Sequence, residues 1–416
     1  MNSAWRRWHV RGWGTTMLDQ AVVALTNFLL SVAVGRVAGV RGLGQWGLLV
    51  AVALILVGLN RTLLLEPFAA SRSSSQVVPD ELRWLLLGAG AVGTVMTALV
   101  IVSFPAFEGL SPALAVWLVA AFLMQDGGRY LAFKVQEPAK ALRSDLSVLV
   151  VAILTIALTL SAGWRSPNGA VLAWAMGLTV GAAFNQAWRP RQIRWQEAGP
   201  WWVTTCSRLA RSLLEDAVAY IIGVQILLFG LAHLASAAEV GTTRGVSSLF
   251  APVAVAFTGL SVWLVPHLAS RPQASRTKIL RASSLLGGVG MLMLVAATIF
   301  GPRAVELLFG RGIIVGRWDV AWGGLAVVAA AAGSPILAAI RVANQYQTVA
   351  HARSVATVLA MLALWLWPLW QGSEGYLALV ALQGLAVLGA GVTIVARQQS
   401  IGTGVPLSLS THSPKE

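Results

Sequence analysis

Long apolar stretches separated by short polar segments dominate the chain. Most of these stretches are about 17 to 23 residues long, the length at which an α-helix crosses the hydrocarbon core of a bilayer. Such a pattern predicts an all-α integral membrane protein with about twelve transmembrane helices. The predicted spans are 15–34, 43–65, 85–104, 113–133, 146–162, 170–188, 217–234, 240–268, 285–300, 320–340, 355–370 and 376–396.

Composition supports the same class. Hydrophobic residues make up 57% of the 416 positions and charged residues only 11%, whereas a soluble domain carries about 25% charge. The net charge of +14 would elsewhere indicate nucleic-acid binding. Here the basic residues lie in short loops between apolar stretches, so they indicate topology and we expect no nucleic-acid partner.

Alternate loops differ in their basic residues, which predicts the orientation. One set is rich in Lys and Arg and includes Arg6, Arg7, Lys140, Arg143, Arg189, Arg191, Arg276, Lys278 and Arg397. The opposite set holds Arg36, Arg41, Arg165, Arg303, Arg311 and Arg317, half of them in the atypical loop 301–319. The positive-inside rule makes the first set and both termini cytoplasmic. Abundant Arg, Ala, Val and Gly are typical of a GC-rich bacterium, so we expect a bacterial cytoplasmic (inner) membrane.

The loops offer no platform for catalysis. None exceeds about twenty-odd residues, whereas a membrane glycosyltransferase, polymerase or ligase usually needs a substantial extracytoplasmic loop. Cys206 is the single cysteine and lies in a basic stretch, so it has no disulfide or metal-binding partner. His233, His267 and His351 have no metal-ligand spacing. We therefore expect no enzyme activity, no metal and no cofactor.

The two halves of the chain repeat weakly. Asp19 and Pro67 in the first half recur as Asp216 and Pro266 at nearly the same separation. An internal repeat of six helices is typical of transporters that bind substrate between two bundles. The predicted segments are a cytoplasmic N-terminal segment 1–14, lobes 15–190 and 212–397, a basic cytoplasmic linker 191–211 and a flexible tail 398–416.

Four motifs carry a family resemblance. They are the run 26–47 with Arg36 and Gly39, the segment 61–67, the segment 125–130 with the later Asp145, and the run 243–266. At these residues the chain resembles bacterial polysaccharide-biosynthesis membrane proteins, the O-antigen and teichoic-acid flippases of the multidrug/oligosaccharidyl-lipid/polysaccharide exporter superfamily.

The resemblance implies two six-helix lobes around a central cavity that opens alternately to each side of the membrane. It also implies a polyprenyl-pyrophosphate-linked oligosaccharide as cargo. Other expected partners are membrane lipids and, in the same assembly process, a polysaccharide polymerase and glycosyltransferases.

Polar residues within spans are candidates for substrate binding because burying them in lipid is costly. Arginine stays charged and presents a fork of donors to phosphate. The cationic candidates are Arg61, Arg129, Arg244 and Arg341, and Asn27 and Gln225 are candidates for glycan hydroxyls. Two other interpretations remain open. Arg61 and Arg129 either snorkel to the interface or pair with Glu66 and Asp126, and the two amides form interhelical hydrogen bonds.

Three carboxylates are candidates for binding a coupling proton or sodium ion: Asp19, Asp126 and Asp216. The alternative for Asp19 and Asp216 is a structural role at the start of a helix, where a carboxylate stabilises the dipole. Tryptophans near the basic segments, including Trp84, Trp195, Trp201 and Trp202, are interpreted as anchors at the membrane surface.

Two further functions remain open beside glycan flipping. A drug/cation antiporter of the same superfamily would need an acidic cavity, whereas the intramembrane charges here lean basic. A scaffold for polysaccharide synthesis enzymes would need no transport pathway at all.

Overall fold

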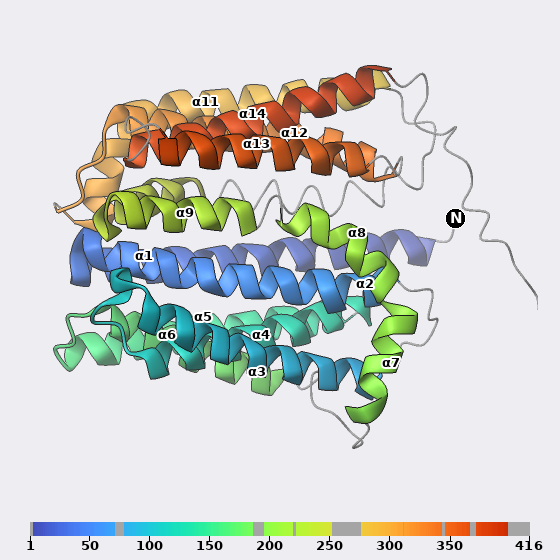
Figure 1. The fold of residues 1–416 in the computed structure, drawn as a ribbon, viewed down its shortest axis with the longest axis horizontal. Helices are drawn as coiled ribbons and strands as arrows, with labels where there is room; N and C mark the ends of the chain where they lie inside the picture. The colour runs from blue at the N-terminus through green and yellow to red at the C-terminus, as the bar shows by residue number, and fades with distance from the viewer. Residues whose placement is uncertain are drawn as a thin grey trace, which may run out of the picture.

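The computed structural model describes residues 3–70, 79–135, 137–185, 195–218, 222–251, 276–310, 312–342, 346–366 and 372–397. The regular secondary structure that these residues form consists of helices, and no strand occurs among them. Figure 1 shows most helices lying side by side along one axis, in two groups. The prediction of an all-α fold is therefore confirmed.

The first group is formed by the N-terminal half of the chain. Its elements are α1 (Ser3–Asn60), the π-helix η1 (Arg61–Leu65), α2 (Glu66–Ala70), α3 (Asp80–Ser103), the 3-10 turn η2 (Pro105–Phe107), α4 (Pro112–Lys134), α5 (Pro138–Ser161) and α6 (Pro167–Phe184). Helix α1 contains two predicted spans. Its backbone leaves helical geometry at Gly39, with φ 69° and ψ −168°, a conformation that glycine adopts without strain. Figure 1 shows the two arms of α1 running back along one another.

The second group follows a crosswise connection. Helices α7 (Trp195–Thr205) and α8 (Ser207–Ala217) form the connection, and the group consists of α9 (Gly223–Leu234), a helical segment 237–251, α11 (Arg276–Phe309), α12 (Arg317–Val342), α13 (Tyr346–Leu366) and α14 (Ser373–Arg397). We call the end of the bundle with α2 and α7, on the right in Figure 1, the Asp19 end. The opposite end, where α1 turns, is the Gly39 end.

Each of the twelve predicted spans coincides at least in part with a helix. Within the described ranges eight helices are long and apolar enough to cross a membrane, with the two arms of α1 counted as one, and α9 is a shorter apolar helix. Their outer faces carry large exposed apolar side chains such as Val102, Leu158 and Leu292, as contact with lipid requires. The chain is a multi-pass membrane protein.

Two predicted loops are helical instead. The basic stretch 189–211 contains all of α7 and the start of α8, because Trp, Leu and Ala alternate with its polar residues and give both helices an apolar face. Helix α11 continues through the predicted loop 301–319 as far as Phe309. Arg303 and Glu306 are exposed on this extension, while Val305 and Phe309 are buried, so the extension is amphipathic.

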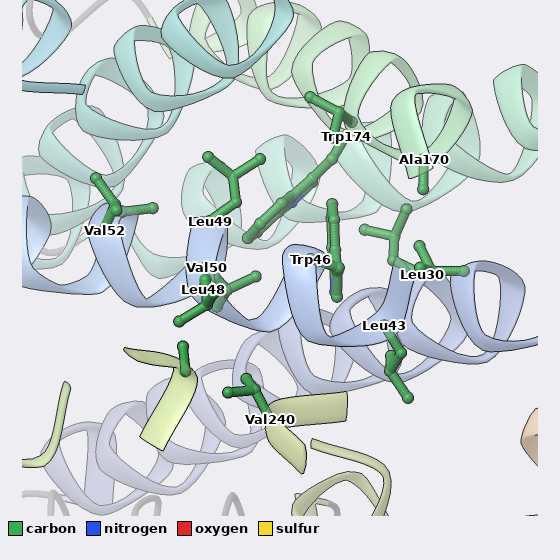
Figure 2. Packing of buried hydrophobic residues seen from close by; sticks show 14 of the residues in the cluster. Leu30, Leu43, Trp46, Leu48, Leu49, Val50, Val52, Ala170, Trp174 and Val240 are labelled. Carbon is green, nitrogen blue, oxygen red and sulfur yellow. The ribbon is translucent and has the colours of Figure 1, made fainter. Parts of the chain in front are cut away.

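Aromatic and branched side chains fill the core of the first group. The rings of Trp46 on α1 and Trp174 on α6 lie with their centroids 5.2 Å apart, and both residues are buried. Figure 2 shows these two rings between the α1 leucines and α6, with Val240 of segment 237–251 packed on the other side of α1. One continuous buried cluster therefore includes residues from both groups of helices.

The two groups meet through glycines at the Gly39 end. A Cβ placed on Gly44 would lie 1.6 Å from the carbonyl oxygen of Ala237, and one on Gly241 would lie 1.9 Å from that of Val40. Only glycine permits backbones to approach this closely. Arg36 adds hydrogen bonds across the same contact, from Nε to the Leu308 carbonyl at 2.7 Å and from Nη2 to the Leu307 carbonyl at 2.6 Å.

Candidate functional site

Charged side chains from four elements converge inside the first group of helices, at its Asp19 end. They are Asp19 on α1, Arg61 on η1, Asp126 and Arg129 on α4, and Asp145 on α5. We call these five residues the charge cluster. Four of its members were predicted as site residues, and the fold brings Asp19 and Arg61 together with Asp126 and Arg129, which lie three positions apart on α4.

Arg61 and Asp126 form one half of the charge cluster. The Arg61 guanidinium donates from Nε to Asp126 Oδ2 at 2.8 Å and from Nη2 to Oδ1. The two side chains differ in accessibility: 38% of Arg61 is exposed, against 1% of Asp126. This bidentate pair confirms one of the two interpretations left open for Arg61, pairing with Asp126.

Arg129 forms the other half, between two carboxylates. Its Nη2 lies 2.9 Å from Asp19 Oδ2, and its Nε lies 3.1 Å from Asp145 Oδ2. Gln125 donates its side-chain amide to Asp145 Oδ1. A longer contact of 3.8 Å from Arg129 Nη1 to Asp126 Oδ1 links the two halves.

The formal charges of the charge cluster do not sum to zero. Three carboxylates face two guanidinium groups, so the fully ionised cluster carries one negative charge in excess. Asp19 Oδ1 and both side-chain polar atoms of Asn185 are buried without a hydrogen-bond partner in the part of the chain that the structure describes. An excess buried charge is costly unless it is neutralised, so the cluster has the properties of a site for a proton or a small cation.

Small residues allow this arrangement. Gly128 precedes Arg129 on α4, and a Cβ there would come within 2.9 Å of the Asn185 carbonyl oxygen at the end of α6. A larger residue at position 128 would push α6 away from α4. The glycine therefore keeps the end of α6 close to α4 beside Arg129.

Asp19 lies well inside α1, which begins at Ser3, and Asp216 lies near the end of α8. The alternative role of these two residues at helix starts was therefore wrong. The side chain of Asp216 lies outside the described residues, so its role in ion coupling stays a prediction.

The predicted polar candidates lie away from the charge cluster. Asn27 donates its Nδ2 to the Val23 carbonyl of its own helix at 3.2 Å, which differs from the predicted interhelical bond. Gln225 is half-buried on α9. Arg341 belongs to the last turn of α12, but its side chain falls outside the description.

Arg244 occupies a separate place in the second group of helices. It lies on segment 237–251, against Gly47 of α1 and beside Tyr376 of α14. Its Nε is buried and has no hydrogen-bond partner among the residues described. An arginine in this state has donors available for a ligand.

Sequence reasoning missed Asp145 and Gln125 as site residues. Both stand within the motifs that carry the family resemblance, and Asp145 precedes the predicted span 146–162 by one residue. An ionisable residue at the edge of a span was a usable signal. Its partner Arg129 is 16 positions away and on another helix, so the pairing itself is tertiary information.

No sequence family and no curated protein matches the chain. Solved structures do match its fold. The lipid II flippase MurJ in an inward closed conformation gives a TM-score of 0.68 at 10% identity, covering 93% of this chain and 87% of that one. A multidrug resistance MATE family transporter in an inward-facing conformation gives 0.64 at 13% identity, covering 91% and 94%. The chain has the two-lobe fold of the MOP superfamily.

A third MOP transporter, from Pyrococcus furiosus, matches with a TM-score of 0.58 at 13% identity, covering 93% of this chain and 94% of that one. For that transporter, the reversed polarity of its binding pocket is taken to suggest a different function. Within this fold, the first and second groups of helices are the N-terminal and C-terminal lobes, and the charge cluster belongs to the N-terminal lobe.

Proposed function

We propose that the chain is a transporter that moves polyprenyl-pyrophosphate-linked oligosaccharide across the membrane by alternating access. The observation that carries the proposal is the unequal exposure of the Arg61 and Asp126 pair. The carboxylate is almost fully buried, and the guanidinium is 38% exposed. An approaching ligand therefore meets the cation, which favours an anion such as pyrophosphate.

Two of the cationic candidates, Arg61 and Arg244, lie in different lobes. Arg61 lies toward the Asp19 end of the N-terminal lobe, and Arg244 lies on the C-terminal lobe with a buried Nε that lacks a partner. An anion that must cross an apolar barrier needs a cationic partner on each side of it. Arg61 receives the headgroup from the Asp19 end in this mechanism, and Arg244 receives it before release at the Gly39 end.

The predicted orientation places the Asp19 end in the cytoplasm, where lipid-linked oligosaccharides are assembled. Contacts between the lobes at the Gly39 end involve Arg36, Gly44 and Gly241. A conformation joined there keeps the outer side closed while the headgroup binds Arg61. Breaking these contacts is then the step that exposes the headgroup to the outside.

The excess negative charge of the cluster supports ion coupling. Asp19 and Asp126 were predicted for this role, and Asp145 joins them through Arg129. An anion that binds Arg61 weakens its hold on Asp126 and leaves more negative charge unpaired. Uptake of a proton or a sodium ion by the cluster would restore the balance, so the binding of cargo and the binding of the ion would favour one another.

A drug/cation antiporter is the second candidate, and the same excess negative charge favours it. In that mechanism the cationic drug competes with the ion for the carboxylates. The burial of Asp19, Asp126 and Asp145 to 3% exposure or less argues against direct contact with a bulky drug.

Reconstitution into liposomes tests the proposal. The protein is supplied with a fluorescent polyprenyl-pyrophosphate disaccharide, and flipping is followed by quenching from outside. Arg61→Ala should slow flipping at least tenfold. Arg143→Ala, which removes an exposed arginine near the same end on α5, is the matched control and should flip normally. A native protein that flips no glycan lipid but exchanges a cationic dye for protons would replace the proposal with the antiporter.

A further inference from the structure

A proline interrupts the hydrogen bonding of the helix that carries Arg61. In an α-helix the carbonyl of Leu63 would accept from the backbone N–H of residue 67, but Pro67 has none and its ring crowds that carbonyl. The chain responds with the π-turn Arg61–Leu65, in which the Glu66 N–H donates to the Arg61 carbonyl. Such turns widen the helix by one residue and are frequent at functional sites.

The missing donor is replaced from another helix. The indole N–H of Trp202, on the crosswise helix α7, donates to the Leu63 carbonyl at 2.8 Å. This bond joins the middle of the π-turn to the connection between the lobes. Trp202 was predicted to be an anchor at the membrane surface. Its side chain is half-buried, and its hydrogen bond in addition ties it to the π-turn.

The rest of the connection is also fastened to this region. The rings of Trp201 and Phe68 lie with their centroids 6.2 Å apart. Cys206, between α7 and α8, is completely buried in a cluster with Leu64, Leu65, Phe68, Leu82, Leu86 and Leu131. Helix α7 therefore has little freedom to move without disturbing the π-turn.

Helix α8 extends the path to the other lobe. It contacts η1 and α2 on one side and α13 of the C-terminal lobe on the other. Figure 1 shows α8 running from α7 toward the C-terminal helices at the Asp19 end. These contacts form a continuous path from α13 through α8 and α7 to the carbonyl of Leu63, two residues after Arg61.

We propose that Trp202 is a positioning residue that couples movement of the C-terminal lobe to the π-turn and so sets the orientation of Arg61 toward Asp126. The role of Arg61 in holding cargo rests on the proposed function, whereas the coupling itself does not. When the lobes move, release of the Leu63 carbonyl by Trp202 lets the π-turn rearrange. Arg61 then changes partner at the moment the lobes switch.

The native cysteine supplies a reporter for this coupling. Burial raises the pKa of the Cys206 thiol to about 11, so near pH 7.5 it is neutral as well as covered, and a maleimide should label it very slowly. Detachment of α7 from the π-turn exposes Cys206 and speeds labelling. Because the chain has a single cysteine, labelling reports this place alone.

The test compares three variants in the full-length protein in detergent. Trp202→Phe keeps a ring but removes the donor, and Trp195→Phe, at an exposed position on the same helix, is the matched control. Pro67→Ala restores an N–H four residues after Leu63. We expect Trp202→Phe to speed Cys206 labelling at least fivefold and to increase deuterium uptake across residues 61–68, and Trp195→Phe to change neither. Adding Pro67→Ala to Trp202→Phe should return uptake across 61–68 to near the native level.

A flipping assay separates positioning from general structural damage. Trp202→Phe should raise the glycan-lipid concentration for half-maximal flipping several-fold and leave the maximal rate nearly unchanged, and Pro67→Ala should reverse this. Equal effects of Trp202→Phe and Trp195→Phe, or no rescue of deuterium uptake by Pro67→Ala, would overturn the coupling. Absence of flipping by the native protein would overturn the proposed function alone, because labelling and deuterium uptake are measured without cargo.

Discussion

Arg61 holds both carboxylate oxygens of Asp126 with two donors of one guanidinium group, across 65 positions of sequence. The pair joins the π-turn η1 to α4, so it ties the second arm of α1 to the centre of the N-terminal lobe. Asp126 has a further contact with Arg129 at 3.8 Å. The pair is therefore both a structural link and the most accessible part of the charge cluster.

Removing one partner of the Arg61–Asp126 pair should lower the free energy of unfolding more than removing both partners. Arg61→Ala leaves the carboxylate of Asp126 buried with only the distant Arg129, and breaking a buried pair in this way costs roughly 3 to 5 kcal/mol. We expect the lower end of that range because Arg61 is partly exposed. The double variant Arg61→Ala/Asp126→Ala should recover much of the loss, as measured by thermal unfolding in detergent.

The exposed pair of Lys140 and Glu137, at 3.6 Å, is the control for this cycle. Both side chains are about half exposed, and exposed pairs contribute roughly 0 to 1 kcal/mol. Lys140→Ala should leave the unfolding temperature nearly unchanged. A double variant at Arg61 and Asp126 that is no more stable than Arg61→Ala would show that the charge cluster does not depend on this pair.

Arg36 should hold the lobes together at the Gly39 end. It caps the C-terminal carbonyls of α11 from the other lobe, where a cation also interacts favourably with the helix dipole. Because Arg36 is exposed, we expect Arg36→Gln to weaken the closed contact by about 1 kcal/mol, which is a several-fold shift toward an open end. Spin labels at exposed Ser161 and Ile314, in a Cys206→Ala background, would report this as a longer distance component.

Arg41→Gln is the matched change for that experiment. Arg41 also lies at the Gly39 end, but its ion pair with Glu108 at 3.3 Å stays within the N-terminal lobe and is exposed. The distance distribution should therefore stay native. A similar response to both substitutions would mean that loss of charge, and not loss of the contact between lobes, opens this end.

The effect of Gly44→Ala on stability should be opposite in sign to that of an ordinary glycine-to-alanine change in a helix. Alanine usually stabilises a helix interior by roughly 0.5 to 1 kcal/mol, and this is expected for Gly88→Ala on α3, where the added methyl meets open space. At Gly44 the methyl would collide with the Ala237 carbonyl. The variant should be less stable than the native protein, and its lobes should separate at the Gly39 end. If Gly44→Ala and Gly88→Ala both raised or both lowered the unfolding temperature, that result would contradict the close contact between Gly44 and the Ala237 carbonyl.

Much of the fold could be predicted because apolar length reports directly on membrane spans. All twelve predicted stretches coincide with helix in whole or in part. The linker and the end of α11 were missed because length and charge alone do not distinguish a loop from an amphipathic helix. Arg303 and Glu306 look like loop residues until Val305 and Phe309 are seen to be buried beside them.

The members of the charge cluster could be predicted better than its geometry. Because placing an ionisable side chain within a membrane span is costly, each of four residues could be identified separately: Asp19, Arg61, Asp126 and Arg129. Their pairing depends on how α1, α4 and α5 pack, and no local pattern specifies it. Trp202 was the hardest residue to predict. Its sequence neighbourhood is typical of the membrane surface. Its hydrogen-bond partner is the backbone carbonyl of Leu63, which is available because Pro67, far away in the sequence, has no N–H.

The excess negative charge of the cluster predicts that it binds a proton or a sodium ion, and the two ions can be distinguished. Asp145 is 3% exposed, pairs with Arg129 at 3.1 Å and accepts from Gln125, and the same guanidinium also binds Asp19. Binding of a proton would remove the excess negative charge of the cluster, so proton coupling predicts that the folded protein is stabilised relative to the unfolded chain as the pH falls. Asp145→Asn keeps the shape and removes the excess charge. Between pH 8 and pH 5, the unfolding temperature of Asp145→Asn should vary less than that of the native protein, while exposed Glu108→Gln should follow the native curve.

Replacing choline by sodium at constant ionic strength separates the two ions, because a sodium site predicts stabilisation of the native protein at pH 8 that Asp145→Asn lacks. Equal pH and sodium responses in native protein and Asp145→Asn would remove ion coupling from the cluster.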